Sequence, residues 1–312
     1  MQISWKNWEI NIFFYIRYMI MENKLFLEIP AQPDFSANIM CGSDEIVSKF
    51  YEPLRLAYPD YISRSIIGTD TSGQYQMWLY DFCPEHCEAC VYLQSGVHPI
   101  ETEGYLGLAR IMEMITRNEL PTLRSKVRFL VVPVVSVFGV SKKSEADSIV
   151  KRWDIPHNVL GINANRDCYE CRLNETKNIL AVVEQYRDII DFGFDFHTTT
   201  TEDWGDYLTV YPDNLPHRKE FVALNNFLRS RNITWRQEMI VYSGNSSNYP
   251  TGPNAASYAS YITNEIGIPM CTLEHSDFVF DMCLGTSAAM TRAIELYLNH
   301  IFLALDFYIR KK

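Results

Sequence analysis

Hydrophobic runs and amphipathic segments alternate along most of the chain. Near-continuous apolar runs, which are typical of strands covered on both faces, lie at 91–93, 127–135, 190–197 and 269–274. Segments with apolar residues at helical spacing lie between and around them, at 44–56, 100–117, 174–189, 217–231, 255–266 and 284–309. Further strands are expected at 61–67, 76–82, 207–211 and 239–242. This alternation predicts an α/β fold with a mixed central sheet and helices on both faces.

The domain organisation follows from length and from the lack of linkers. The chain has 312 residues, of which 47% are hydrophobic, and it contains no Gly/Ser-rich linker and no repeat. We therefore expect one domain over 25–312, which is large enough to be a catalytic domain. Residues 1–24 form an extension of uncertain role. Its apolar piece, 12–16, is too short to span a bilayer, which needs about 20 residues. No signal-peptide cleavage site is visible, which favours the cytoplasm but leaves the location open.

The charge of the chain argues against a nucleic-acid partner. The formal net charge is −10, from 28 Lys and Arg against 38 Asp and Glu. Domains that bind phosphate backbones are usually basic. An acidic surface still allows a local basic pocket for an anionic substrate.

One turn carries the strongest candidate chemistry. The segment 95–101 follows an apolar strand, precedes an amphipathic helix and presents His98 and Glu101 three residues apart. An imidazole and a carboxylate at this spacing can converge on one cation. His197, at the end of the strand 190–197, is the best third ligand, although a lone strand-end His is more often structural. Glu103 is the rival carboxylate. We expect Asp195 on the opposite strand face from His197, with a structural role.

Two imidazoles and one carboxylate would leave an open position on a zinc ion, and such a site needs a general base. Glu274 ends the apolar strand 269–274. A carboxylate that closes a buried strand costs free energy unless it is paired. It is therefore either an ion-pair partner of Arg166 or a nearby Lys, or a base that takes a proton from water and passes it to the leaving group.

These residues carry a resemblance to a known family. His98-x-x-Glu101, then Asn165-Arg166, then a strand-end His197, then Thr272-Leu273-Glu274 resemble the zinc carboxypeptidases related to carboxypeptidase A. The resemblance implies an α/β fold with a sheet of about eight strands and one Zn²⁺. It implies that His98, Glu101 and His197 hold the zinc and that Glu274 is the base. Asn165 and Arg166 would bind the free carboxylate of a peptide, which agrees with the forked geometry of Arg.

Two further roles in the family find candidates here. Arg152 is the candidate for the Arg that polarises the scissile carbonyl, with a surface basic residue as the alternative. Tyr249, in a polar loop, is the candidate for the mobile Tyr that closes over substrate. Tyr242 and Tyr258 are its rivals, and Tyr258 falls in an expected helix as a core residue.

The chain also departs from the family, which leaves the substrate open. Asn163 stands where the family has Asp, and the segment between His98 and His197 is short. Short segments also occur in the related deacylases that resemble succinylglutamate desuccinylase and aspartoacylase. The expected function is a zinc metallocarboxypeptidase. The alternatives are an N-acyl amino-acid deacylase, or a non-catalytic module that binds carboxylate-terminated peptides.

The eight cysteines suggest a further possibility. Cys83, Cys87 and Cys90, and separately Cys168 and Cys171, have spacings that resemble half-sites for structural zinc. A second metal, a disulfide and reduced core thiols are all compatible with these spacings. Cys90 and Cys271 fall in apolar strands, so we expect both in the core.

Overall fold

The computed structural model describes residues 27–145, 155–199, 211–212, 214–230, 257–276 and 285–308. Its centre is a six-stranded sheet with the order β1-β2-β4-β3-β5-β6. The strands are β1 (Ile62–Thr69), β2 (Gln76–Phe82), β3 (Ala89–Ser95), β4 (Val127–Val132), β5 (Phe192–Thr199) and β6 (Met270–Ser276). β4, β3, β5 and β6 run parallel, whereas β2 is antiparallel to both β1 and β4, so the sheet is mixed.

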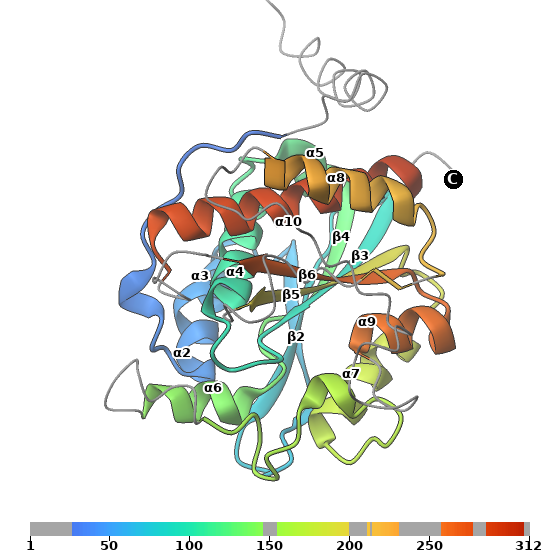
Figure 1. Ribbon diagram of the computed structural model, residues 1–312. Coiled ribbons are helices and arrows are strands. Elements are labelled where there is room, and N and C mark those ends of the chain that lie inside the picture. Colours follow the sequence, from blue (N-terminus) through green and yellow to red (C-terminus); the bar gives the residue numbers. More distant parts are fainter. Residues whose placement is uncertain are drawn as a thin grey trace, which may run out of the picture.

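Helices cover both faces of this sheet (Figure 1). α4 (Thr102–Thr116) and α10 (Ser287–Tyr308) pack on one face, and α7 (Asn174–Gln185) and α9 (Tyr258–Tyr261) on the other. The remaining helical elements are η1 (Ser36–Asn38), α2 (Ser43–Ile46), η2 (Val47–Tyr51), α3 (Glu52–Ala57), α5 (Pro121–Lys126), α6 (Val137–Ser144), η4 (Ala164–Arg166), α8 (Arg218–Ser230) and η6 (Ile262–Ile266). The layered arrangement is the α/β architecture that the sequence predicts.

β5 illustrates how the alternation of strand residues divides the two faces. Phe194 and Phe196 are fully buried on the side of α4 and α10, where Phe196 stacks on Tyr297 with ring centroids 4.1 Å apart. The Tyr297 hydroxyl also donates to the backbone oxygen of His197, at 2.7 Å. Burial of each such aromatic ring stabilises the fold by about 1.5–3 kcal/mol. Asp195, which lies between them, and His197, which follows them, therefore face the opposite side of the sheet.

Most of the expected elements are confirmed, with shifted boundaries. The antiparallel pair β1–β2 and the end of β4 just before Pro133 are as predicted. α4 begins at Thr102, two residues later than expected, because 97–101 form a turn. α5 and α6 were not predicted, since both are short. The described residues form six strands where the sequence predicts about eight, and the expected strand 239–242 and nearly all of 207–211 lie outside those residues.

The division of the chain at residue 24 also falls outside the described part and stays a prediction. The first described residues pack against α10, and the backbone N–H of Leu27 donates a hydrogen bond to the side chain of Asn299 at 2.7 Å. Within the described ranges, none of the helices has both the length and the hydrophobicity needed to cross a bilayer.

Candidate metal centre

The sheet topology brings the predicted site residues to one edge. β3 lies between β4 and β5 in the sheet. After β3 the chain forms β4 on one side of it and then crosses over to form β5 on the other side. Ligand sites of open α/β sheets lie at such reversals of strand order, outside the carboxyl ends of the strands. His98 follows β3, His197 lies near the end of β5, and Glu274 pairs directly with His197 across to β6.

A close helix–strand contact places Glu101 beside β5. A methyl group on Gly104 would lie 2.7 Å from the backbone oxygen of Phe196, so the first turn of α4 approaches the strand this closely only with glycine there. The Gly104 N–H donates to the hydroxyl of Thr198 at 3.1 Å. In return, the Thr198 N–H donates to Oε2 of Glu101 at 3.1 Å. The carboxylate is thereby oriented toward β5.

His98, Glu101 and His197 converge on one point. Their nearest ligand atoms all lie within 4.8 Å of one another. Nδ1 of His98 is 2.5 Å from Oε1 of Glu101, and Nδ1 of His197 is 2.8 Å from Oε2. Both ring nitrogens of His197 are buried, and neither makes a hydrogen bond of acceptable angle with the described residues. Two imidazole nitrogens and a carboxylate that share one focus are the donor set of a catalytic zinc site.

The rival carboxylate is engaged elsewhere. Glu103 is fully buried and its Oε1 accepts a hydrogen bond from the N–H of Gly285 at 2.8 Å. Among the described residues, His98, Glu101 and His197 are the one group of three or more potential ligands with this convergence. Glu101, not Glu103, therefore completes the set.

Three buried carboxylates, those of Glu101, Asp195 and Glu274, dominate the electrostatics around His197. Burial opposes ionisation of Glu101, but the His98 and His197 imidazoles hold its pKa well below the usual range. Burial likewise opposes the charged form of His197, yet the carboxylates of Asp195, Glu101 and Glu274 raise its pKa well above the ordinary value. Burial raises the pKa of Glu274 to about 8; His197 lowers it, and the two other carboxylates add to the rise.

Asp195 contradicts the expectation that it faces away from His197. Its Oδ2 lies 2.9 Å from Nε2 of His197, and both side chains are completely buried. Side chains two positions apart in a strand point to the same face, so strand periodicity itself already indicates this arrangement. A carboxylate at the second ring nitrogen of a His fixes which nitrogen carries the proton and leaves Nδ1 free to ligate.

Glu274 lies at the next position across the sheet. Its Oε1 is 3.8 Å from Nδ1 of His197, and 6% of the residue is exposed. The alternative role for Glu274, an ion pair with Arg166, is not found at contact distance among the described residues, although Arg166 is near enough to lower the pKa of this carboxyl group. A carboxylate beside the focus of the three ligands, and slightly open to solvent, can exchange a proton with water there.

Asn165 and Arg166 are presented by the short helix η4. The Asn163 side chain begins this helix by accepting from the N–H of Asn165 at 2.9 Å, and it also lies 3.3 Å from Nε2 of His98. Asn165 is buried, and its Oδ1 accepts from the N–H of Tyr258 at 3.0 Å. Within the described part of the chain its amide NH₂ has no hydrogen-bond partner. Arg166 is half-buried and donates to the backbone oxygen of Asn165. Asn163 thus places the start of η4 beside His98, and Arg166 lies near enough to Glu274 to lower its pKa.

A third histidine, which the sequence did not single out, lies beside the centre. The ring of His157 is 5.0 Å from that of His98, and its buried Nδ1 has no hydrogen-bond partner among the described residues. Burial, together with His98, lowers the pKa of His157 to about 4. His157 lies in a loop without periodicity, so no sequence pattern marks it.

Some predicted residues cannot be placed. Arg152, Tyr249 and Tyr242 lie outside the described ranges, so their roles stay predictions. Tyr258 is fully buried, and its hydroxyl donates to Thr176 at 3.1 Å, which confirms it as a core residue.

The cysteines do not form a second centre in the described structure. Cys83, Cys87, Cys90, Cys168 and Cys171 are all free thiols. In the described ranges none of them belongs to a group of three convergent ligands. Cys90 in β3 is buried, as expected, and so is Cys271 in β6. Reduced thiols are the arrangement that this structure holds.

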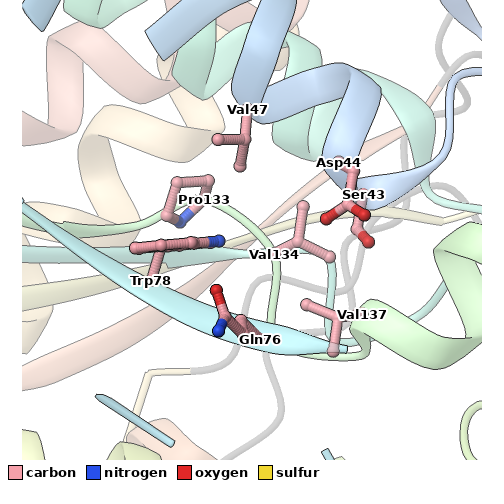
Figure 2. A pocket seen from close by; sticks show the side chains of 8 residues that line it. All are labelled: Ser43, Asp44, Val47, Gln76, Trp78, Pro133, Val134 and Val137. Atoms are coloured by element: carbon pink, nitrogen blue, oxygen red, sulfur yellow. The ribbon is translucent and has the colours of Figure 1, made fainter. Parts of the chain in front are cut away.

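A separate small pocket lies between α2, β2 and the segment after β4 (Figure 2). Trp78, Pro133 and Val134 form much of its wall, and Asp44 is its one ionisable residue. Its empty space of about 220 Å³ includes open solvent, and most of the side chains around it are apolar. None of the predicted site residues lines it, so the candidate chemistry lies at the three-ligand centre.

Comparison with known proteins identifies the fold. No protein-family model matches the chain, and no curated protein matches it. Several solved structures, however, are similar to it. A metallo-carboxypeptidase from Burkholderia cenocepacia is 17% identical, with a TM-score of 0.60 over 85% of this chain and 70% of that one. Thrombin activatable fibrinolysis inhibitor is 16% identical, with a TM-score of 0.69 over 95% and 83%. Carboxypeptidase A from Helicoverpa armigera is 11% identical, with a TM-score of 0.63 over 95% and 81%. The chain therefore has the metallo-carboxypeptidase fold.

Proposed function

We propose that this chain is a zinc-dependent hydrolase that cleaves a peptide or amide bond next to a free carboxylate, as a metallocarboxypeptidase does. The observation that carries the proposal is the convergence of His98, Glu101 and His197 within 4.8 Å, with Glu274 next to His197. A zinc ion held by the three ligands would polarise the scissile carbonyl and acidify a water molecule.

Glu274 is the proposed general base. It accepts a proton from the attacking water and delivers that proton to the amine as the carbon–nitrogen bond breaks. Its position favours this role because its carboxylate is largely desolvated, which keeps its pKa high enough to bind a proton in mid-reaction. Oδ2 of Asp195 lies 2.9 Å from Nε2 of His197, so Asp195 would hold the proton on that nitrogen when a metal binds and keep Nδ1 available as a ligand.

Asn165 and Arg166 are the proposed anchors of the substrate carboxylate. Asn165 has an unused amide donor, and Arg166 supplies a positive, planar group near the centre. Arg152 is proposed to polarise the carbonyl and Tyr249 to cover the bound substrate, both on the resemblance to the carboxypeptidases. These anchors favour substrates with a C-terminal carboxylate.

An N-acyl amino-acid deacylase is the second candidate. Asn163, not Asp, lies beside Nε2 of His98, and this departure from the carboxypeptidase pattern favours a different substrate class on the same chemistry. Both candidates use one metal, one base and one carboxylate anchor. The substrate assay below separates them.

The test combines metal analysis with hydrolysis by the full chain. We expect one zinc per chain, and release of a free amino acid from N-blocked dipeptides or from N-acyl amino acids. Glu274→Gln should retain the zinc and lose about 10²- to 10⁴-fold in kcat, the usual contribution of a general base. Zinc binding without hydrolysis of either substrate class would instead indicate the non-catalytic binding module. Full activity of Glu274→Gln would remove the base assignment.

A further inference from the structure

The proposed mechanism leaves His157 without a role. This residue precedes η4, and its ring lies 5.0 Å from that of His98 at an interplanar angle of 39°. Its Nδ1 is buried, and no hydrogen-bond partner for it exists among the described residues. Buried ring nitrogens usually have partners, because an unpaired polar group costs about 1–3 kcal/mol. An unsatisfied imidazole beside a metal centre points to a partner that arrives with the ligand.

The fold holds His157 in this position through backbone contacts. A methyl group on Gly139 of α6 would lie 2.7 Å from the backbone oxygen of Pro156 and 2.9 Å from that of His157. The loop therefore packs directly against the backbone of α6, at a position where a residue with a side chain would clash. The next residue, Asn158, is 1% exposed, and its side chain both donates to and accepts from the backbone of Ile162. The ring is thus carried by a fixed loop.

His157 and Glu274 lie next to different members of the centre. The loop of His157 packs on α6, which follows β4, and β4 is next to β3. The ring of His157 lies 5.0 Å from that of His98, and the ring of His98 lies 4.9 Å from that of His197. Oε1 of Glu274 is 3.8 Å from Nδ1 of His197. A base next to His197 and a hydrogen-bond donor next to His98 could act on the same carbonyl group.

The chemistry of the imidazole suits a donor. A neutral imidazole carries one N–H and a protonated one carries two, so His157 can donate in either state. His157 does not belong to the group of convergent ligand atoms formed by His98, Glu101 and His197. It is therefore placed to contact a ligand of the metal, not the metal.

We propose that His157 is a further catalytic residue, whose N–H donates a hydrogen bond to the carbonyl oxygen of the substrate and stabilises its negative charge after attack. This inference rests on the proposed function. The water oxygen forms a bond to the carbonyl carbon, the C=O π electrons move to the oxygen that faces His157, and the water proton passes to Glu274. The oxyanion then reforms the carbonyl as the carbon–nitrogen bond breaks and the amine takes the proton from Glu274.

A binding experiment tests this role without a substrate. The full chain is loaded with Co²⁺ and titrated with acetohydroxamate, a small anion for the open metal position, while visible absorption is recorded. His157→Phe should weaken the anion about ten- to a hundredfold, as expected for loss of one hydrogen bond to a charged oxygen. His157→Gln, which retains an N–H donor, should recover much of that affinity. The cobalt spectrum before addition of the anion should be the same in all three proteins.

Kinetics provide the second readout. With a substrate from the hydrolysis assay, His157→Phe should lower kcat about 10²- to 10³-fold, in the range for one oxyanion donor, with little change in KM. His157→Leu replaces the Phe variant if that protein does not fold. The matched control is His86→Phe, because the His86 side chain is 92% exposed and precedes β3, whereas His98 follows the other end of that strand. It should match the wild type in both experiments.

The outcomes separate this inference from the proposed function. Equal anion affinity in the wild type, His157→Phe and His157→Gln would overturn the role of His157 alone. A changed cobalt spectrum with weakened metal binding in His157→Phe would also overturn it, because His157 would then be a ligand. The expected anion effect in a protein that hydrolyses neither substrate class would support the donor and overturn the hydrolase. Failure of the wild type to bind cobalt would overturn both.

Discussion

Two groups of charged side chains on the same sheet differ in how completely they are paired. On β2 and β4, Arg128 donates to both oxygens of Asp81, at 2.9 and 2.6 Å, in a bidentate pair that balances its own charge. At the carboxyl ends of β3, β5 and β6, Glu101, Asp195 and Glu274 surround the single buried ring of His197. The first group is complete by itself, whereas the second gathers three carboxylates around one buried imidazole.

The difference indicates what each group is for. A buried carboxylate without a compensating charge is costly, and selection for stability alone would remove it. Asp81 and Arg128 can be explained by stability and strand pairing. The gathering of carboxylates around His197 is explained when a cation is added, since a divalent ion balances Glu101 and its neighbours and can take Nδ1 of His197 as a ligand. The contrast therefore favours a metal centre over a structural ion-pair cluster.

The largest expected effect is loss of the metal. His98→Ala removes one of three protein ligands, so zinc should no longer co-purify and the metal should not raise the thermal midpoint of the variant. Metal analysis and thermal unfolding with and without added zinc measure this. Zinc content equal to that of the wild type would exclude His98 from the ligand set.

Matched Asp→Asn changes compare the two groups directly. Asp195→Asn should weaken zinc about 10- to 100-fold, the usual cost of losing a carboxylate that orients a ligating His. Asp81→Asn should leave the zinc affinity unchanged and lower the free energy of unfolding by about 1–2 kcal/mol, because it breaks a charge-assisted pair. Competition with a zinc chelator and urea unfolding measure the two quantities. Equal zinc affinities in both variants would contradict the role of Asp195.

A smaller effect is expected from pH. In the metal-free protein the carboxylates raise the pKa of His197 well above its ordinary value, so the ring is protonated near neutral pH. Zinc must displace that proton from Nδ1. Apparent zinc affinity should therefore fall as pH falls, by up to about tenfold per unit for each displaced proton. Isothermal titration in buffers of different ionisation heat counts the protons, and a count of zero would contradict this account.

The sequence predicts local features well. His98 and Glu101 are predictable because they lie three residues apart in one turn, and His197 and Glu274 because apolar strands end at them. The expectation that Asp195 faces away from His197 is wrong, and strand periodicity alone indicates the right face. Arg152 and Tyr249 fall outside the described residues, so the structure leaves those predictions as they were.

His157 shows where prediction from sequence ends. Its place beside His98 depends on the contact of its loop with Gly139, and Glu101 reaches β5 through the contact of Gly104 with Phe196. These are packing contacts between segments that are distant along the chain, and they leave no periodic pattern. The same holds for the order of the strands, which brings β3 and β5 together across the crossover from β4.

The most direct test of the metal centre is anomalous diffraction from a crystal of the full chain, with data collected on both sides of the zinc absorption edge. The account predicts one anomalous peak, bonded to Nδ1 of His98, the Glu101 carboxylate and Nδ1 of His197, with Glu274 nearby but not bonded. A protein that contains zinc but shows its peak at Cys83 and Cys87, with none at the three ligands, would contradict it.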